Sequence, residues 1–161
     1  MSGEKKAALL IENPSMSKMM TEGFFGNIPH AQALGIEFVF AKPYKASLKI
    51  PYKAELVGNP VTGTLHGGVL ISLMDSVAGM AVFCSLSSME PIATLDLRLD
   101  YLKPAAIGEA VVAEAECYKL TDTIAFVRGG AYQGSAENPI ASFVATFMRA
   151  SSSKIQGMEA K

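Results

Sequence analysis

The residues that could do chemistry gather between Asn59 and Gly68, and a single acid, Asp75, follows them. Backbone N–H groups at the start of a helix, here at Gly67 and Gly68, favour developing negative charge and can form an oxyanion hole for a carbonyl oxygen. A carboxylate opposite such a hole can act as a general base on water or attack as a nucleophile. Together these groups suit the hydrolysis of an activated acyl group.

The same residues also have a purely structural explanation. His66 immediately precedes the predicted helix and could cap it, and the glycines after it could simply allow a tight turn. Asp75, however, lies within an apolar helical segment, where a carboxylate without a partner is costly and often functional. No lysine or arginine between Lys53 and Arg98 is available to neutralise it locally. This favours the functional interpretation.

Gly67 and Asp75 are eight residues apart, which is about 12 Å along a helix axis. They therefore cannot act on one small reacting group within the same chain. Two antiparallel copies of the helix would bring each N-terminus near the partner subunit's Asp75. Small residues beside Asp75 would permit that approach: Gly68, Ser72, Ser76 and Gly79. The sequence thus predicts an isologous homodimer with two composite sites.

The elements that must position these residues follow from the periodicity. A helix is predicted from Gly67 to about Leu86, because apolar residues recur along it at helical spacing. Alternation predicts strands at Ile36–Ala41, Tyr44–Pro51, Thr94–Leu102, Ala110–Leu120, Ile124–Tyr132 and Ile140–Arg149. In the third of these, strict alternation places Thr94 on the face away from Leu95 and Leu97. One central helix and long antiparallel strands indicate an α+β fold, with a single sheet wrapped around the helix.

The segments around this core are less regular. A short helix is predicted over residues 15–26, with Ser15 as its cap, and another helical turn at Ala31–Leu34. Residues 52–66 show no period and are predicted to form a long loop, a kind of segment that is often functional. The first 13 residues of the chain are polar or small and are expected to be loose, as are residues 150–161.

Length and composition predict one folded domain. The 161 residues are 50% apolar and 18% charged, which is ample for one core and too apolar for disorder. We expect an N-terminal extension with a short helix (1–30), one domain (31–150) and a flexible C-terminal tail (151–161). The net charge of −1 gives no sign of a nucleic-acid partner.

No membrane partner is expected either. Asp75 interrupts the apolar stretch Val69–Leu86, and the run Ala7–Ile11 is too short for a signal peptide. We therefore expect a cytoplasmic protein, in which Cys84 and Cys117 are buried reduced residues rather than a disulfide framework.

Three segments of the sequence resemble those of a known family. The run Gly63 to Gly68 followed by Asp75, the strand Thr94 to Pro104 and the later segment Thr123 to Val127 are similar to hotdog-fold acyl-CoA thioesterases of the phenylacetic-acid-degradation (PaaI-like) type. The resemblance covers roughly residues 33–148. It implies the hotdog fold and hydrolysis of an acyl-CoA thioester to a free acid and CoA.

The resemblance also implies roles for individual residues. Gly67 matches the glycine whose N–H polarises the thioester carbonyl, and His66 matches the histidine that shapes this hole. Asp75 matches a catalytic carboxylate supplied by the other subunit. Asn59 matches a loop asparagine that helps to hold the carbonyl oxygen or the water, and Thr94 matches a hydroxyl residue that steadies the water.

The implied substrate is an acyl-CoA, with Gly68, Lys103 and Arg128 as candidate binding residues. Each of the two cations, taken singly, is also explained as a solvated strand end. No metal or other cofactor is expected, because His30 and His66 are the only histidines and no Cys/His cluster is present. The expected assembly is a homodimer that pairs into a dimer of dimers.

Two other functions stay open at this stage. A hotdog dehydratase or hydratase uses a histidine with a distant acid or a closely spaced Asp–His pair, whereas here no histidine follows Asp75. A non-catalytic acyl-CoA-binding protein would be indicated by a missing acid, but Asp75 is present. The acyl group, its carrier (CoA or acyl carrier protein) and the choice between nucleophilic and general-base attack are not determined by the sequence.

Overall fold

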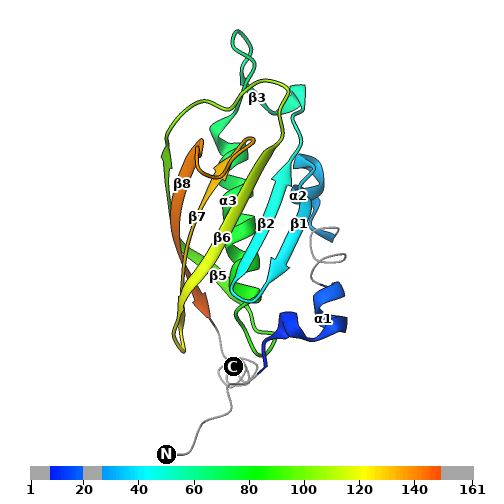
Figure 1. Cartoon of the computed structure of the whole chain (residues 1–161), viewed down its shortest axis with the longest axis vertical. Helices are drawn as coiled ribbons and strands as arrows, with labels where there is room; N and C mark the ends of the chain where they lie inside the picture. Colours follow the sequence, from blue (N-terminus) through cyan, green and yellow to red (C-terminus); the bar gives the residue numbers. More distant parts are fainter. Residues whose placement is uncertain (1–7, 20–26, 150–161) are drawn as a thin grey trace, which may run out of the picture.

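One long helix wrapped by one sheet forms the centre of the molecule (Figure 1). The computed structural model describes residues 8–19 and 27–149. The helix, α3, spans Gly67–Phe83, and the six-stranded sheet has the order β1-β2-β6-β7-β8-β5. All neighbouring strands in this sheet are antiparallel. The predicted α+β hotdog architecture is therefore confirmed.

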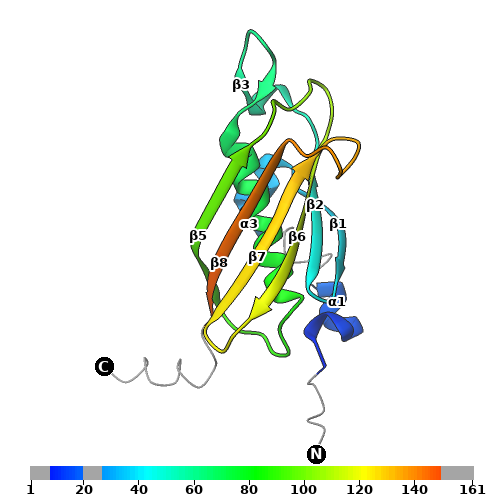
Figure 2. The same cartoon turned by 60° about the vertical axis from the view of Figure 1, so that its left-hand side comes forward.

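The strands lie close to the predicted segments. They are β1 (Glu37–Lys42), β2 (Lys45–Ile50), β5 (Ile92–Tyr101), β6 (Val111–Leu120), β7 (Ile124–Tyr132) and β8 (Ala141–Arg149). The outermost strands are β1 and β5 (Figure 2). One side of β5 therefore has no strand beside it among the described residues, although this strand runs for ten residues along α3.

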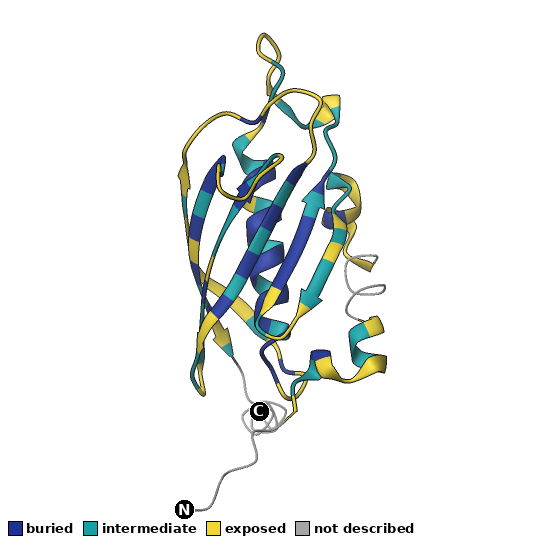
Figure 3. Ribbon diagram, viewed as in Figure 1, coloured by how far each residue is buried: buried dark blue, intermediate teal, exposed yellow. Residues whose placement is uncertain are grey.

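The core lies between α3 and the face of the sheet that points toward it, which we call the inner face (Figure 3). The fully buried residues of α3 include Leu73, Met74, Val77, Met80 and Val82. They meet strands whose inward positions are small, as in β6, where Val111, Ala113, Ala115 and Cys117 are buried. Small side chains allow the helix to approach the sheet closely. In the described part of the chain, no helix combines the length and apolarity that a membrane span requires.

The segment before α3 is more ordered than its lack of periodicity suggests. A short 3-10 helix at Ala54–Leu56 leads into a small hairpin formed by β3 (Val57–Asn59) and β4 (Thr64–Leu65). The prediction of a plain loop over 52–66 is therefore wrong. Strands of two or three residues are too short to show an alternating pattern in the sequence.

The N-terminal segments also differ from the predictions. The helix α1 (Pro14–Lys18) is capped by Asn13, whose side chain accepts from two backbone N–H groups, so Ser15 is not the cap. The cap lies two residues before the predicted one, because Pro14 occupies the first helical position, where proline is favoured. A 3-10 helix at Leu10–Glu12 is tied to the core by a backbone bond to Leu86, so this part is not loose.

The helix α2 (Pro29–Leu34) begins two residues earlier than predicted and ends at Gly35, which adopts a left-handed conformation with φ 71°. The predicted continuation of the first helix over residues 20–26 lies outside the described residues. So do residues 1–7 and the predicted C-terminal tail, 151–161.

The two cysteines give a first testable prediction. Cys84 and Cys117 are both buried and free, and burial raises the pKa of the Cys84 thiol to about 12 and also raises the pKa of Cys117. Because the thiolate is the reactive form, we expect neither to react with Ellman's reagent in the folded protein at about pH 8. Both should react in denaturant. A thiol that reacts at the same rate in the folded protein would contradict the packing described here.

Candidate active site

The start of α3 is organised around one peptide group, the link between Gly67 and Gly68. His66 precedes the helix in an extended conformation, and its Nδ1 accepts from the N–H of Gly68 at 2.9 Å. The carbonyl of Gly67, in the same peptide group, accepts from the hydroxyl of Tyr101 at 3.0 Å. The N–H of Gly68, which the sequence suggested as a second oxyanion donor, is therefore taken by His66.

The N–H of Gly67 has a different environment. Among the described residues no acceptor is bonded to it, and it lies at the helix terminus, where the helix dipole favours negative charge. Gly67 is also half-buried rather than deeply enclosed. At this helix start the N–H of Gly67 is therefore the donor that no acceptor of the described residues occupies.

A pocket of about 470 Å³ lies between the β3–β4 hairpin and this N-terminus. It is lined by Gly58, Asn59, Thr62, Thr64, Leu65, His66, Gly67 and Pro104. The Oδ1 of Asn59 accepts from the N–H groups of Val61 (3.0 Å) and Thr62 (3.3 Å), which fixes the hairpin turn. The amide nitrogen of Asn59 donates to no described residue, and Asn59 lines the same pocket as Gly67.

A second pocket, of about 440 Å³, also borders Gly67. Its lining is mainly apolar: Thr64, Leu65, Gly67, Leu70, Tyr101, Leu102, Lys103, Pro104 and Ala105. Lys103, one of the two candidate cations, lies on the rim of this pocket. The two pockets share Thr64, Leu65, Gly67 and Pro104, so a ligand that bonds to this glycine can extend into either pocket.

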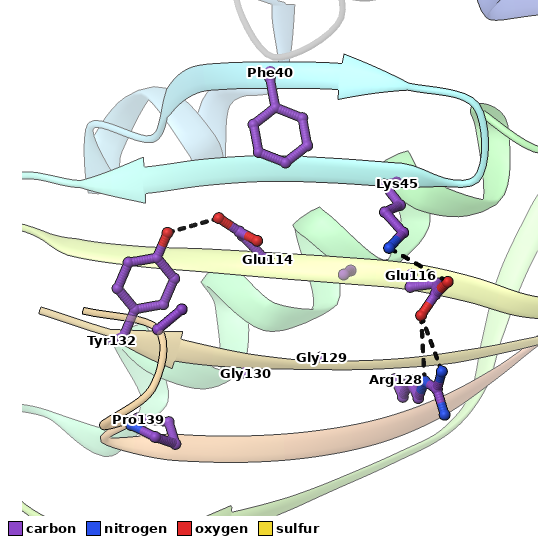
Figure 4. A pocket seen from close by; sticks show the side chains of 11 residues that line it. Phe40, Lys45, Glu114, Glu116, Arg128, Gly129, Gly130, Tyr132 and Pro139 are labelled. Atoms are coloured by element: carbon purple, nitrogen blue, oxygen red, sulfur yellow. Dashed lines mark hydrogen bonds and ion pairs between the residues drawn. The ribbon is translucent and has the colours of Figure 1, made fainter. Parts of the chain in front are cut away.

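Arg128, the other predicted cation, is not brought to this end of α3. It lies on the outer face of the sheet, where its guanidinium bonds to Glu116 at 3.1 Å (Figure 4). This bond, helped by Lys45, holds the pKa of Glu116 below its usual value. Arg128 is therefore already paired, on the face opposite α3.

The outer-face pocket around this ion pair has a volume of about 380 Å³. Tyr132 donates to Glu114 there at 2.6 Å, and the pKa of Tyr132 is raised to about 12, mainly by burial and also by the adjacent carboxylate. No part of the α3 terminus lines this pocket. Within one chain this pocket is therefore separate from Gly67.

The carboxylate of Asp75 lies two turns further along α3 and has one hydrogen-bond partner from the sheet. The hydroxyl of Thr94 donates to Oδ1 of Asp75 at 2.8 Å. A β-bulge makes this contact possible, because the pairing of β5 with β8 shifts between Thr94 and Asp96. Leu95 is left without an opposite residue and is 55% exposed, while Thr94 faces inward opposite the buried Phe147. The predicted alternation is therefore wrong at this single position.

The donor and the carboxylate are separated on one helix. Since α3 is continuous over this stretch, Gly67 and Asp75 stand about 12 Å apart along its axis. Between them Ile71 is 44% exposed, and Ser72 contacts His30 of α2 (Oγ to Nε2, 3.1 Å). Within the described residues, no three His, Cys, Asp or Glu side chains group in a way that could hold a metal ion. Within one chain the two groups therefore lie apart, on a partly exposed side of α3.

Two residues at the helix start were missed by the sequence reasoning. Gly58 is required because a Cβ there would stand 2.7 Å from the Cα of His66. Tyr101, in the predicted strand Thr94–Leu102, was given no role in the sequence-based prediction. Its position at the end of the strand could have indicated a role, because a tyrosine hydroxyl on the inner side of a strand end often bonds to a nearby backbone group.

Comparisons with known proteins identify related sequences. A profile of the thioesterase superfamily matches residues 62–139, which include the start of α3 and Asp75. The medium/long-chain acyl-CoA thioesterase YigI of Escherichia coli K12 is 31% identical over 144 residues, covering 81% of this chain and 92% of that protein. Mouse acyl-coenzyme A thioesterase 13 is 41% identical over 64 residues, covering 40% of this chain and 45% of the mouse protein.

The fold has solved counterparts as well. The phenylacetic acid degradation protein PaaI from Thermus thermophilus, solved in a mutant form, superposes with a TM-score of 0.67 at 28% identity. The match covers 76% of this chain and all of that one. The similarity therefore extends over the whole helix-and-sheet unit and not only over the motif at the start of the helix.

Proposed function

Because the chain belongs to the thioesterase superfamily and is a PaaI-like thioester hydrolase, we propose that it acts on acyl-CoA and releases a free acid and CoA. The proposal is carried by one observation: the N–H of Gly67 is left for a carbonyl oxygen, while the two polar groups beside it are already bonded. The names of the E. coli and mouse relatives, both acyl-CoA thioesterases, support CoA as the carrier.

We propose further that each site is shared by two subunits. The N–H of Gly67 of one protomer and the partner subunit's Asp75 would face one thioester, because the two groups of a single chain are too far apart. The free edge of β5 supports this assembly, since an unpaired strand edge readily adds a strand from a second copy. A homodimer is thus the smallest active unit, and a dimer of dimers would hold four such sites.

The chemistry at the shared site follows from these groups. The thioester carbonyl accepts from the N–H of Gly67 and the amide of Asn59, which polarises it. A water bonded to the partner subunit's Asp75 gives up a proton to that carboxylate as its oxygen adds to the carbonyl carbon. Thr94 holds the carboxylate through Oδ1, so Oδ2 can face the water.

The negative charge that forms on the carbonyl oxygen is stabilised by the same two donors. The C–S bond then breaks, and the CoA sulfur leaves as a thiolate, which needs little assistance because thiols are moderately acidic. In the alternative nucleophilic path Asp75 would attack and form a mixed anhydride. A single turnover in ¹⁸O-water separates the two paths, because hydrolysis of the anhydride can place the label in Asp75.

A direct test uses purified protein and acyl-CoA substrates of short, long and aromatic acyl groups. Released CoA can be followed with Ellman's reagent, since the protein's own thiols are buried. We expect release of free CoA with at least one substrate class. Binding of acyl-CoA without any release would instead identify a non-catalytic binding protein.

Lys103 gives a prediction about substrate binding. We expect Lys103→Ala to raise KM for acyl-CoA about two- to fivefold, since an exposed cation contributes modestly to binding a phosphate. Added salt should reduce the difference from wild type, and kcat should change little. Lys119→Ala is the matched control, because Lys119 lies near the opposite end of the sheet. Equal effects of the two substitutions would show that Lys103 has no particular role.

A further inference from the structure

We propose that Tyr101 is a positioning residue for the oxyanion hole, an inference that rests on the proposed thioesterase function. Its hydroxyl would fix the orientation of the Gly67 N–H without touching the substrate. The starting observation is the bond from the Tyr101 hydroxyl to the Gly67 carbonyl at 3.0 Å. This bond links the C-terminal end of the edge strand β5 to the first residue of α3.

The bond belongs to a clamp that acts on both sides of one peptide group. Tyr101 bonds to the C=O of the Gly67–Gly68 peptide, and Nδ1 of His66 bonds to its N–H at 2.9 Å. A peptide group is planar, so two bonds at opposite edges fix the direction of its plane. The Gly67 N–H lies in the preceding peptide group, whose His66 carbonyl accepts from the N–H of Val69 at 2.9 Å. With that side held, fixing the Gly67–Gly68 plane limits how far Gly67 can rotate between its two peptide groups.

This restriction matters because two consecutive glycines begin the helix. Glycine has more backbone freedom than any other residue, and the first turn of a helix lacks the full set of helical hydrogen bonds. Without further contacts, an N–H group with this freedom would point in several directions. An oxyanion hole works best when its donor is already aligned before the charge develops.

The space around Gly67 is shaped to the same contact. A Cβ on Gly67 would stand 2.9 Å from the hydroxyl oxygen of Tyr101 and 3.3 Å from its Cζ. The end of the phenol ring therefore occupies the place that a side chain at position 67 would need. Tyr101 is 52% exposed, so burial does not force its hydroxyl to find a partner in the protein. The bond to the backbone carbonyl persists at a surface where water could replace it.

The test is Tyr101→Phe, which keeps the ring and removes the hydroxyl. We expect kcat to fall about tenfold, less than the 10²–10³-fold loss on removing an oxyanion donor, because the Gly67 N–H is still present. KM should stay within about twofold and the melting temperature within a few degrees. Tyr132→Phe is the matched control: it also removes a bonded hydroxyl, but on the outer face, and should leave kcat unchanged.

A second variant makes the coupling between the two residues measurable. Gly67→Ala places a methyl group against the hydroxyl in the wild-type background but meets only the ring in the Y101F background. The loss of kcat caused by G67A should therefore be smaller in Y101F than in wild type. Strict additivity of the two losses would contradict the proposed contact.

The outcomes separate this inference from the function on which it rests. If wild type releases CoA and Y101F keeps wild-type kcat and KM, Tyr101 has no positioning role but the function stands. If Y101F raises KM and leaves kcat unchanged, Tyr101 contacts the substrate, and the positioning role is again wrong. If wild type hydrolyses no thioester at all, the proposed function itself fails.

Discussion

Asp75→Asn is expected to lower kcat about 10²–10⁴-fold for every thioester that the protein accepts, because the neutral amide cannot take a proton from water. The fold should be kept, since asparagine has the same shape and its amide oxygen can still accept from Thr94. The measurement is steady-state CoA release, with the circular dichroism spectrum and melting temperature as checks on folding.

Asp100→Asn is the matched control for this substitution. Asp100 is an exposed carboxylate on β5 that bonds to Arg98 at 3.2 Å, so its removal changes the net charge equally but leaves α3 untouched. We expect near wild-type turnover from it. Near-normal hydrolysis by Asp75→Asn would show that Asp75 is structural and that the site described here is misplaced.

Mixed dimers give the second large effect. One chain carries Asp75→Asn, and the other carries Gly67→Pro, which deletes the N–H of the oxyanion hole. Each homodimer should be almost inactive. A heterodimer would hold one intact shared site and one site with both lesions, so it should recover up to about half of the wild-type activity per dimer. Two different affinity tags allow the heterodimer to be purified before assay.

The backbone conformation at Gly67 suits a proline, although the added Cβ would stand 2.9 Å from the Tyr101 hydroxyl, which must then move. Gly67 is not among the described glycines with positive φ, and proline is accepted at the first position of a helix. His66, with φ −63° and ψ 135°, already has the conformation preferred before a proline. Gly67→Ala in the same pairing controls for added side-chain atoms. If folded, verified heterodimers stay as inactive as their parents, the shared-site proposal is wrong.

Much of this architecture was predictable because long elements carry long patterns. Apolar residues at helical spacing predicted α3, and alternation predicted the six strands to within one or two residues. The short elements were missed, because the β3–β4 hairpin and the 3-10 helices are too brief to show a period. The cap at Asn13 was misplaced by the ambiguity of a polar residue on each side of Pro14.

The site was predictable as a set of residue types but not as a set of contacts. His66, Gly67 and Asp75 stand out in the sequence by type and spacing. That Gly68 would lose its N–H to His66 depends on a ring orientation that no pattern encodes. The hydroxyl of Tyr101 bonds to Gly67, a residue 34 positions earlier in the sequence. Contacts between residues so far apart in the sequence depend on the fold and cannot be read from a local pattern.

Because of the bulge at Leu95, the position of the Thr94 hydroxyl depends on the number of residues in β5 as well as on their identity. One extra residue in β5 sets which side of the strand Thr94 occupies. Deleting a residue there would preserve every side chain named in the mechanism and still turn the threonine away from Asp75. When this chain is aligned with relatives, a one-residue gap in this strand therefore carries as much meaning as a substitution of the threonine itself. If such a gap is overlooked, the alignment pairs Thr94 with a residue whose side chain points to the opposite face of the sheet. The role of the Thr94 hydroxyl would then be assigned to the wrong residue.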